Sequence, residues 1–179
     1  MAEKYLVVID MQKDFTYGAL KNEDAISIIP NVVNKVREFP GKVIFTYDTH
    51  QENYLDTQEG KLLPVSHCIK GTEGWELVDE LQVQKDALSA LTFEKPAFGS
   101  VKLAEELAKI HNTENIEEIE LVGICTDICV ISNAMLLKAF LPEVPIVVDA
   151  SCCAGVTFES HQTALNAMKA CQIQVIGEK

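Results

Sequence analysis

The sequence predicts an α/β fold in which a mostly parallel sheet is covered by helices on both faces. Short apolar runs alternate along the chain with segments whose apolar residues recur at helical spacing. Such alternation is the signature of parallel strands joined by helical crossovers. The 179 residues, 47% of them hydrophobic, suffice for one full core, so we expect a single domain over residues 1–179.

The apolar runs predict a six-stranded sheet, with strands at 5–10, 42–48, 90–95, 119–122, 144–150 and 172–176. Helices are expected from Ala25 or Pro30 to Phe39, then at 75–81, at 100–111 behind a Ser100 cap, at 131–140 and at 158–171. The polar–apolar alternation of the last strand indicates a sheet edge. Residues 49–74 show little periodicity, and connections of this length are usually functional.

Charge and cysteine usage limit the classes of partner. The formal net charge of −12 disfavours nucleic acid and anionic membrane surfaces, and there is no basic run to offset it. The sequence shows no signal-peptide pattern and no apolar run of membrane-spanning length, so a cytoplasmic location is expected. The six cysteines are scattered, as expected of free thiols in a reducing compartment. The sequence leaves open whether the chain forms a homo-oligomer.

The segment Gly123-Ile124-Cys125-Thr126-Asp127-Ile128-Cys129-Val130 joins a predicted strand to a predicted helix. Ligands of open parallel sheets bind at such turns, outside the carboxyl ends of the strands. With Asp127 as the N-cap, Cys129 would lie in the first helical turn, where the positive end of the helix dipole stabilises a thiolate. Cys129 is therefore a candidate nucleophile, although a small buried hydrophobic role is the alternative for any free cysteine.

Two further charged residues close predicted strands. Asp10 ends the first strand and Lys95 ends the third, so a parallel sheet brings both to the edge that carries the cysteine turn. A carboxylate whose pKa is raised by desolvation can take the thiol proton, and an ammonium can hold the sulfur anion. The alternatives are a turn aspartate and a solvated lysine.

A third group of residues has the chemistry of a metal site. Asp48 and His50 are two apart at the end of the second strand, which places both side chains on the same side in extended geometry, and His67 follows in the long connection. One carboxylate and two imidazoles form a set for a divalent metal ion with open positions. Taken alone, this pattern is a weak signal that surface histidines explain more often than a metal site does.

Several segments together resemble a known family. They are Asp10-Met11-Gln12-Lys13-Asp14-Phe15, Lys95-Pro96-Ala97-Phe98, the cysteine turn, Asp48-Thr49-His50, and the segment from His67 to Trp75. Together they resemble the isochorismatase-like cysteine hydrolase superfamily, whose order the first three segments keep, and, within it, the nicotinamidases. The resemblance implies a three-layer α/β/α fold and a catalytic triad of Asp10, Lys95 and Cys129. It also implies a cis peptide before Cys125 and an oxyanion hole formed by the backbone N–H groups of Cys125 and Cys129.

The same resemblance implies a cofactor and a substrate. Asp48, His50 and His67 would hold a divalent metal ion, with zinc expected, and Glu59 corresponds less closely to an additional ligand. The substrate would be a small aromatic amide, nicotinamide or pyrazinamide, hydrolysed through a Cys129 thioester. Phe15 and Phe98 would stack on its ring or, alternatively, pack in the core. The rivals are a metal-independent cysteine amidohydrolase acting on a carbamoyl or ureido compound, an isochorismatase proper, and a non-catalytic binding module.

Overall fold

The computed structural model describes residues 3–178 and contains one six-stranded parallel sheet. The strands are β1 (Glu3–Ile9), β2 (Lys42–Asp48), β3 (Leu91–Lys95), β4 (Ile116–Ile124), β5 (Ile146–Ala154) and β6 (Gln174–Ile176). Their spatial order is β3-β2-β1-β4-β5-β6, and every pairing is parallel. The predicted fold class is confirmed, and β6 lies at an edge as predicted.

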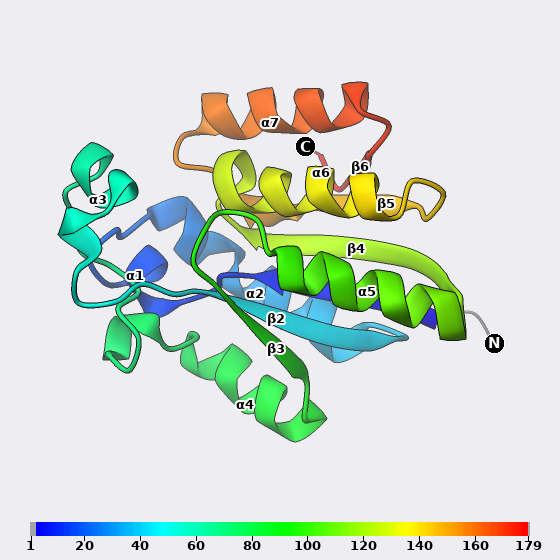
Figure 1. Cartoon of the computed structure of the whole chain (residues 1–179), viewed down its shortest axis with the longest axis horizontal. Helices are drawn as coiled ribbons and strands as arrows, with labels where there is room; N and C mark the ends of the chain where they lie inside the picture. Colours follow the sequence, from blue (N-terminus) through cyan, green and yellow to red (C-terminus); the bar gives the residue numbers. More distant parts are fainter. Residues whose placement is uncertain (1–2, 179) are drawn as a thin grey trace.

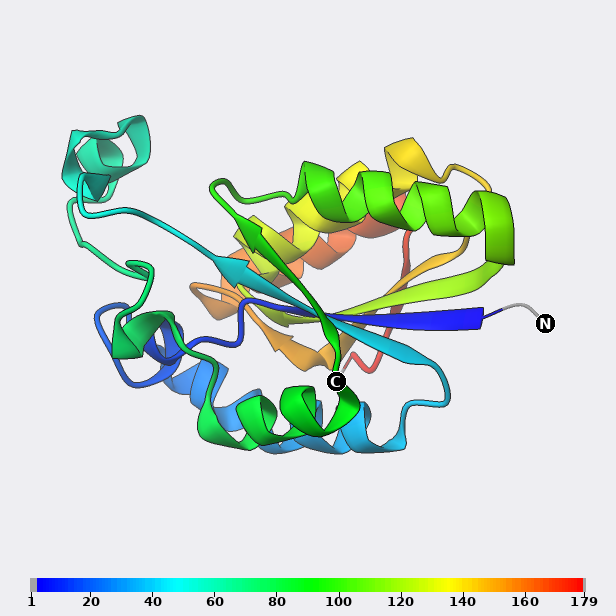
Figure 2. The ribbon, with the colours of Figure 1, turned by 60° about the horizontal axis from the view of Figure 1, so that its bottom comes forward.

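Helices cover both faces of this sheet (Figures 1 and 2). One face carries α2 (Glu23–Glu38) and α4 (Asp79–Leu88), and the other carries α5 (Val101–Glu114), α6 (Ile131–Phe140) and α7 (Phe158–Ala170). Side chains of β1 alternate between the two cores: Val7 and Ile9 pack on the α5–α7 side, whereas Leu6 and Val8 pack on the α2 side. Burial on both faces explains why the strands read as continuous apolar runs.

The strand order places the switch point of the sheet between β1 and β4. The chain moves outward from β1 to β2 and β3, then returns to the other side of β1 as β4. In open α/β sheets the crevice at such a point is where ligands bind. Asp10 follows β1 and the cysteine turn follows β4, so both lie at this crevice.

Two predicted helix starts are wrong. The predicted helix at 75–81 starts only at Asp79, because the preceding residues are tied to the loop after β1: the Lys13 N–H donates to Glu76 and the Val78 N–H donates to Met11. Leu77 forms an isolated bridge with Gln12 instead of a helical turn. The first long helix starts at Glu23, because Asn22 accepts hydrogen bonds from two backbone N–H groups, and it continues through Pro30.

The long connection after β2 contains short structured segments. These are η1 (Tyr54–Asp56), α3 (Gln58–Leu62) and η2 (Glu73–Trp75); α1 (Lys13–Thr16) lies in the loop after β1. The part of the chain with α3 projects beyond the sheet in both views (Figures 1 and 2). Within residues 3–178, no helix combines the length and apolar character that crossing a membrane requires.

Candidate active site

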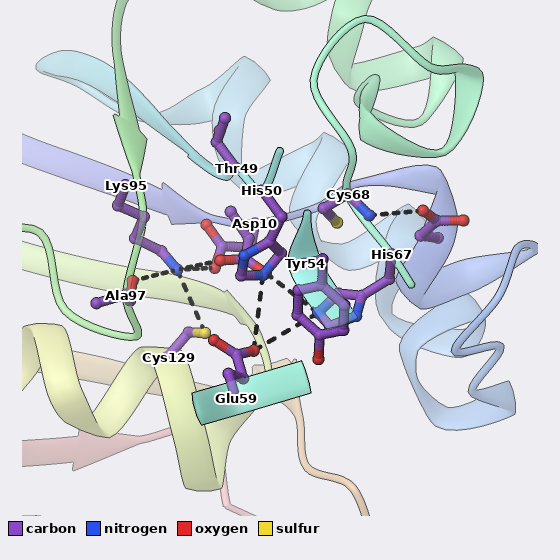
Figure 3. Close-up of polar contacts among 12 residues, drawn as sticks. Asp10, Thr49, His50, Tyr54, Glu59, His67, Cys68, Lys95, Ala97 and Cys129 are labelled. Atoms are coloured by element: carbon purple, nitrogen blue, oxygen red, sulfur yellow. Dashed lines mark hydrogen bonds and ion pairs between the residues drawn. The ribbon is translucent and has the colours of Figure 1, made fainter. Parts of the chain in front are cut away.

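The Lys95 ammonium connects the residues that the sequence places at the strand ends (Figure 3). Its Nζ lies 2.6 Å from Asp10 Oδ2 and 3.4 Å from Cys129 Sγ. It also lies 3.5 Å from Asp48 Oδ1 and donates to the Ala97 carbonyl at 3.2 Å. Lys95 is only 1% exposed. The structure thus brings a thiol, a carboxylate and a buried ammonium together, as the predicted triad requires.

Asp10 is held in an uncommon backbone conformation. Its φ of 46° is in the left-handed region, which non-glycine residues rarely adopt and which tends to occur at functional sites. Thr46 on β2 stabilises it twice, since its hydroxyl donates to Asp10 Oδ1 at 2.6 Å and accepts from the Asp10 N–H at 3.2 Å. One carboxylate oxygen therefore faces Thr46, and the other faces Lys95.

The protonation states of the three groups follow from burial and charge. Burial raises the pKa of Asp10 despite the opposing Lys95 charge, so this carboxylate is a stronger base than an exposed aspartate. Burial acts against the charge of Lys95, but Asp10 and the Cys129 sulfur outweigh it and raise the Lys95 pKa. Lys95 is therefore a permanent cation next to a proton acceptor.

The pKa of Cys129 lies well above that of an ordinary thiol. Burial is the main cause, the Asp10 charge adds to it, and Lys95 only partly opposes both. Desolvation therefore acts against the thiolate that a helix N-terminus was expected to favour. The carboxylate nearest to Lys95 is that of Asp10, at 2.6 Å.

The turn that carries Cys129 differs from the predicted N-cap. Residues Thr126–Val130 form one π-helical turn, η3, before α6 begins, and the N-cap residue is Cys125. Asp127 does not cap the helix; its Oδ1 accepts from the Val156 N–H instead. Single π turns frequently occur at functional sites. The cis peptide between Ile124 and Cys125, which the family resemblance implied, is present.

Asp48, His50, Glu59 and His67 form a cluster of metal-ligating side chains whose ligand atoms all lie within 4.8 Å of one another. Asp48 Oδ2 lies 3.1 Å from His50 Nε2 and 3.5 Å from His67 Nε2. Glu59 Oε1 lies 3.6 Å from the first nitrogen and 3.8 Å from the second. Ligands bound at about 2.0–2.1 Å to a tetrahedral ion lie roughly 3.3 Å apart, which fits these separations.

Neighbouring groups orient the metal-ligating side chains. His67 Nδ1 lies 2.8 Å from the Val65 carbonyl. Because a carbonyl only accepts, Nδ1 must carry the proton, which leaves the Nε2 lone pair free for a metal ion. Burial opposes ionisation of Asp48, but the neighbouring His50 and His67 imidazoles and the Lys95 ammonium together outweigh it and hold the Asp48 pKa below its usual value. The buried Tyr54 ring packs edge-on against both imidazoles. The cluster therefore fits a divalent cation.

A cavity of about 1100 Å³ opens onto both groups of residues. Its polar lining includes Asp48, Glu59, His67 and Cys129, and its apolar lining includes Phe15 and Phe98. Phe15 packs edge-on against His67 at 5.6 Å between ring centroids, and Phe98 is 44% exposed. Both aromatic rings therefore face the cavity, and core packing does not account for Phe98.

Two residues that support the site, Thr46 and Gln12, were not among the site residues predicted from the sequence. Thr46 has no local signal, because its role depends on the pairing of β1 with β2. Gln12 is buried in the loop after β1 and links this loop to the end of β2 and to η2. Its Nε2 donates to the Asp48 and Trp75 carbonyls, and its Oε1 accepts from the Asp48 N–H. Gln12 stands within the motif after Asp10, so that motif was the available signal.

With this geometry in place, comparison with known proteins shows the class of the chain. The family model for the isochorismatase domain matches residues 4–178, and the chain belongs to this family. The chain is 30% identical to the nicotinamidase/pyrazinamidase of Bacillus subtilis, covering 97% of this chain and 99% of that structure with a TM-score of 0.84.

Two other proteins are also similar over nearly their whole length. The Pyrococcus horikoshii pyrazinamidase, solved in complex with zinc, is 26% identical over 98% of this chain and 99% of its own, with a TM-score of 0.78. An Arabidopsis thaliana protein named as a probable inactive nicotinamidase is 31% identical over 94% of this chain and 91% of its own.

Proposed function

We propose that this protein is a nicotinamidase, a hydrolase that converts nicotinamide, and also pyrazinamide, to the carboxylic acid and ammonia. One observation carries the proposal: the buried Lys95 ammonium contacts Asp10, Cys129 and Asp48, and the last two line one cavity. Asp48 belongs at the same time to the cluster of metal-ligating side chains. Nucleophile and cation site thus line one cavity, with the base held against the same ammonium, which suits an amide on an aromatic ring that also bears a metal-binding nitrogen.

The proposed reaction has two covalent steps. Asp10 takes the proton of Cys129, and the sulfur attacks the carboxamide carbon. Backbone N–H groups of Cys125 and Cys129 receive the developing oxyanion, where a single such donor is typically worth about 3 kcal/mol. The C–N bond then breaks as Asp10 returns the proton to the leaving nitrogen, which releases ammonia and leaves a thioester.

Hydrolysis of the thioester restores the enzyme. Asp10 removes a proton from water, the resulting hydroxide attacks the acyl carbon, and the C–S bond breaks. The proton held by Asp10 returns to the sulfur, and the acid leaves. Lys95 keeps the sulfur anion and the Asp10 carboxylate in register throughout.

Asp48, His50, Glu59 and His67 would hold the metal ion, with zinc as the expected one. When bound, the ion supplies a Lewis-acidic centre that a pyridine or pyrazine nitrogen can ligate. Fixing a ring in this way orients its carboxamide, and orientation of reacting groups lowers barriers by several kcal/mol, up to about 10. Phe15 and Phe98 would bound the ring from the sides.

Ammonia release from nicotinamide tests the proposal directly. The purified protein should release ammonia and nicotinate in equal amounts, and Cys129→Ala should lower kcat by at least about 10³-fold while the fold is retained. Cys171→Ala is the matched control, because Cys171 is an exposed thiol, and it should leave turnover unchanged. Turnover retained by Cys129→Ala would contradict the thioester mechanism.

Chelation separates the two amidase candidates. A nicotinamidase that orients its ring through the metal ion should lose turnover after dialysis against a chelator and regain it with zinc. A cysteine amidohydrolase acting on a carbamoyl or ureido compound would be insensitive to the chelator and inert towards nicotinamide. Because one relative is named inactive, turnover must be measured before any finer comparison.

A further inference from the structure

A buried asparagine joins the turn that carries Cys129 to the loop that follows Lys95. Asn133 lies on α6, one helical turn beyond Cys129, and is 1% exposed. Its Nδ2 donates to the Cys129 carbonyl at 2.8 Å and to the Phe98 carbonyl at 3.1 Å. Its Oδ1 accepts from the Ser100 N–H at 2.9 Å. Because the carbonyls only accept and the N–H only donates, this orientation of the amide is fixed.

Together, these contacts bind Asn133 to main-chain groups of two separate segments. One segment is the π turn of the nucleophile, and the other is the loop 96–100 that leads from β3 into α5. The Phe98 carbonyl and the Ser100 N–H both find their side-chain partner in Asn133. Ser100 in turn caps α5 through its hydroxyl, which accepts from the Leu103 N–H. Asn133 therefore fixes both ends of the stretch 98–100.

The same loop supplies one of the contacts that hold the Lys95 ammonium. Lys95 Nζ donates to the Ala97 carbonyl, as Figure 3 shows, at 3.2 Å, while its other contacts go to Asp10, Cys129 and Asp48. Ala97 directly precedes Phe98, so a shift of the Phe98 carbonyl moves the Ala97 carbonyl with it. The position of the ammonium beside the sulfur thus depends on where the loop is held.

We propose that Asn133 is a positioning residue: by holding loop 96–100 against the Cys129 turn, it keeps the Lys95 ammonium beside the Cys129 sulfur. The inference rests on the proposed function in that the sulfur is the nucleophile. Asn133 itself does not line the cavity, so it acts through the loop. It also places Phe98, whose side chain does line the cavity.

Asn133→Thr isolates this link. A helical threonine hydroxyl bonds the carbonyl four residues earlier, so the Cys129 carbonyl keeps a donor, but the shorter side chain cannot reach Phe98 and Ser100. We expect kcat to fall at least about tenfold with KM changed less than about threefold, because the lost interaction acts on the reacting groups. Asn31→Thr is the matched control: this asparagine also donates to a carbonyl, that of Ser151, but it lies on the surface of α2.

Alkylation of Cys129 by iodoacetamide, followed by mass spectrometry, tests the inference without any substrate. Loss of Lys95 from the sulfur should slow alkylation at least about fivefold at about pH 8. The rate is measured below the thermal unfolding temperature of each variant, and Asn133→Ser serves if the threonine variant does not fold. An unchanged or faster alkylation rate, or a rise in KM at unchanged kcat, would overturn the role of Asn133. If the wild type does not hydrolyse nicotinamide, the proposed function fails, but the alkylation result still decides the inference.

Discussion

At the scale of single residues, the Asp10 carboxylate acts on Cys129 in two opposing ways. It is the proposed base for the thiol, yet its charge also raises the thiol pKa, second only to burial. The two effects have different consequences when the charge is removed. The base is needed for turnover, whereas the charge hinders spontaneous formation of the thiolate.

Asp10→Asn should therefore separate turnover from thiol reactivity. We expect kcat to fall by roughly 10³-fold, because no group remains to take the proton. Alkylation of Cys129 near neutral pH should become faster than in the wild type, because the Lys95 ammonium then acts on the sulfur without an opposing carboxylate. Rates of iodoacetamide modification between about pH 6 and 10 check this. Slower alkylation at every pH would show that Asp10, not Lys95, controls the sulfur.

At the scale of elements, Gly123 at the end of β4 permits the close approach of β4 to β1. Its φ of 117° is a conformation that other residues rarely adopt, and a Cβ there would overlap the Ile9 carbonyl oxygen. Gly71 in the long connection has a φ of 84°, but a Cβ added to it would lie in open space, with no atom of a more distant residue within 4 Å. The two glycines thus share a positive φ, which would strain any other residue, and differ in packing.

Gly123→Ala should cost at least about 3 kcal/mol of unfolding free energy, since steric overlap adds to strain. Gly71→Ala is the control and should cost about 1 kcal/mol, from strain alone. Urea denaturation of both variants measures the difference. Equal costs would mean that the contact between β4 and the Ile9 carbonyl relaxes without penalty.

A second element-scale feature is the ion cluster that joins α2 to β4 and β5. Lys35 Nζ lies 2.7 Å from Glu120 and 2.8 Å from Asp149. Burial opposes ionisation of Asp149, but hydrogen bonds from Lys35 and Ser151 outweigh it and hold the Asp149 pKa below its ordinary value. A carboxylate with a lowered pKa contributes stability above its unfolded pKa of 3.8 and loses that contribution as the pH falls.

Lys35→Met should lower the free energy of unfolding at pH 7 by about 1–3 kcal/mol, because it leaves two poorly exposed carboxylates without their cation. The difference from the wild type should shrink below about pH 4, where Asp149 of the unfolded chain takes up a proton. Lys42→Met removes the exposed ion pair with Glu114 and should cost about 0–1 kcal/mol. Urea titrations at several pH values measure all three proteins.

At the scale of the whole molecule, the cluster of metal-ligating side chains joins the sheet to the long segment between β2 and α4, which contains α3. Asp48 ends β2, whereas Glu59 lies on α3 and His67 follows it. A ligand that binds only the folded chain stabilises it by mass action, by about 2.7 kcal/mol at a hundredfold excess over Kd. Metal binding should therefore stabilise the fold as well as orient a substrate.

Zinc added to metal-free protein should raise Tm by several degrees, at roughly 2–4 °C per kcal/mol for a chain of this size. The rise should vanish in His67→Ala and diminish in Glu59→Gln. Glu52→Gln is the control, because Glu52 is an exposed carboxylate in the same connection and should respond like the wild type. Differential scanning calorimetry gives the shifts. A full zinc response in His67→Ala would mean that zinc binds elsewhere.

Much of the fold and of the site is predictable from residues that have strong local patterns. Alternating apolar segments predict the parallel sheet, and parallel strands necessarily bring Asp10, Asp48, Lys95 and the cysteine turn to one edge. The predicted helix start at residue 75 was wrong because Leu77 and Val78 are buried against the loop after β1. Apolar periodicity does not encode such a contact between distant segments. The single-domain expectation and the roles of the individual site residues remain predictions.

By itself, then, the sequence determined the six strands, the long helices that join them and the charged groups that close the strands, because hydrophobic periodicity and strand ends are local properties. Only the tertiary structure decided the strand order that sets the crevice between β1 and β4, the raised pKa of the Cys129 thiol, and the links made by Thr46 and Asn133. These depend on desolvation and on hydrogen bonds between segments distant along the chain. Neither the desolvation nor these hydrogen bonds arise until the chain has folded and brought the segments together.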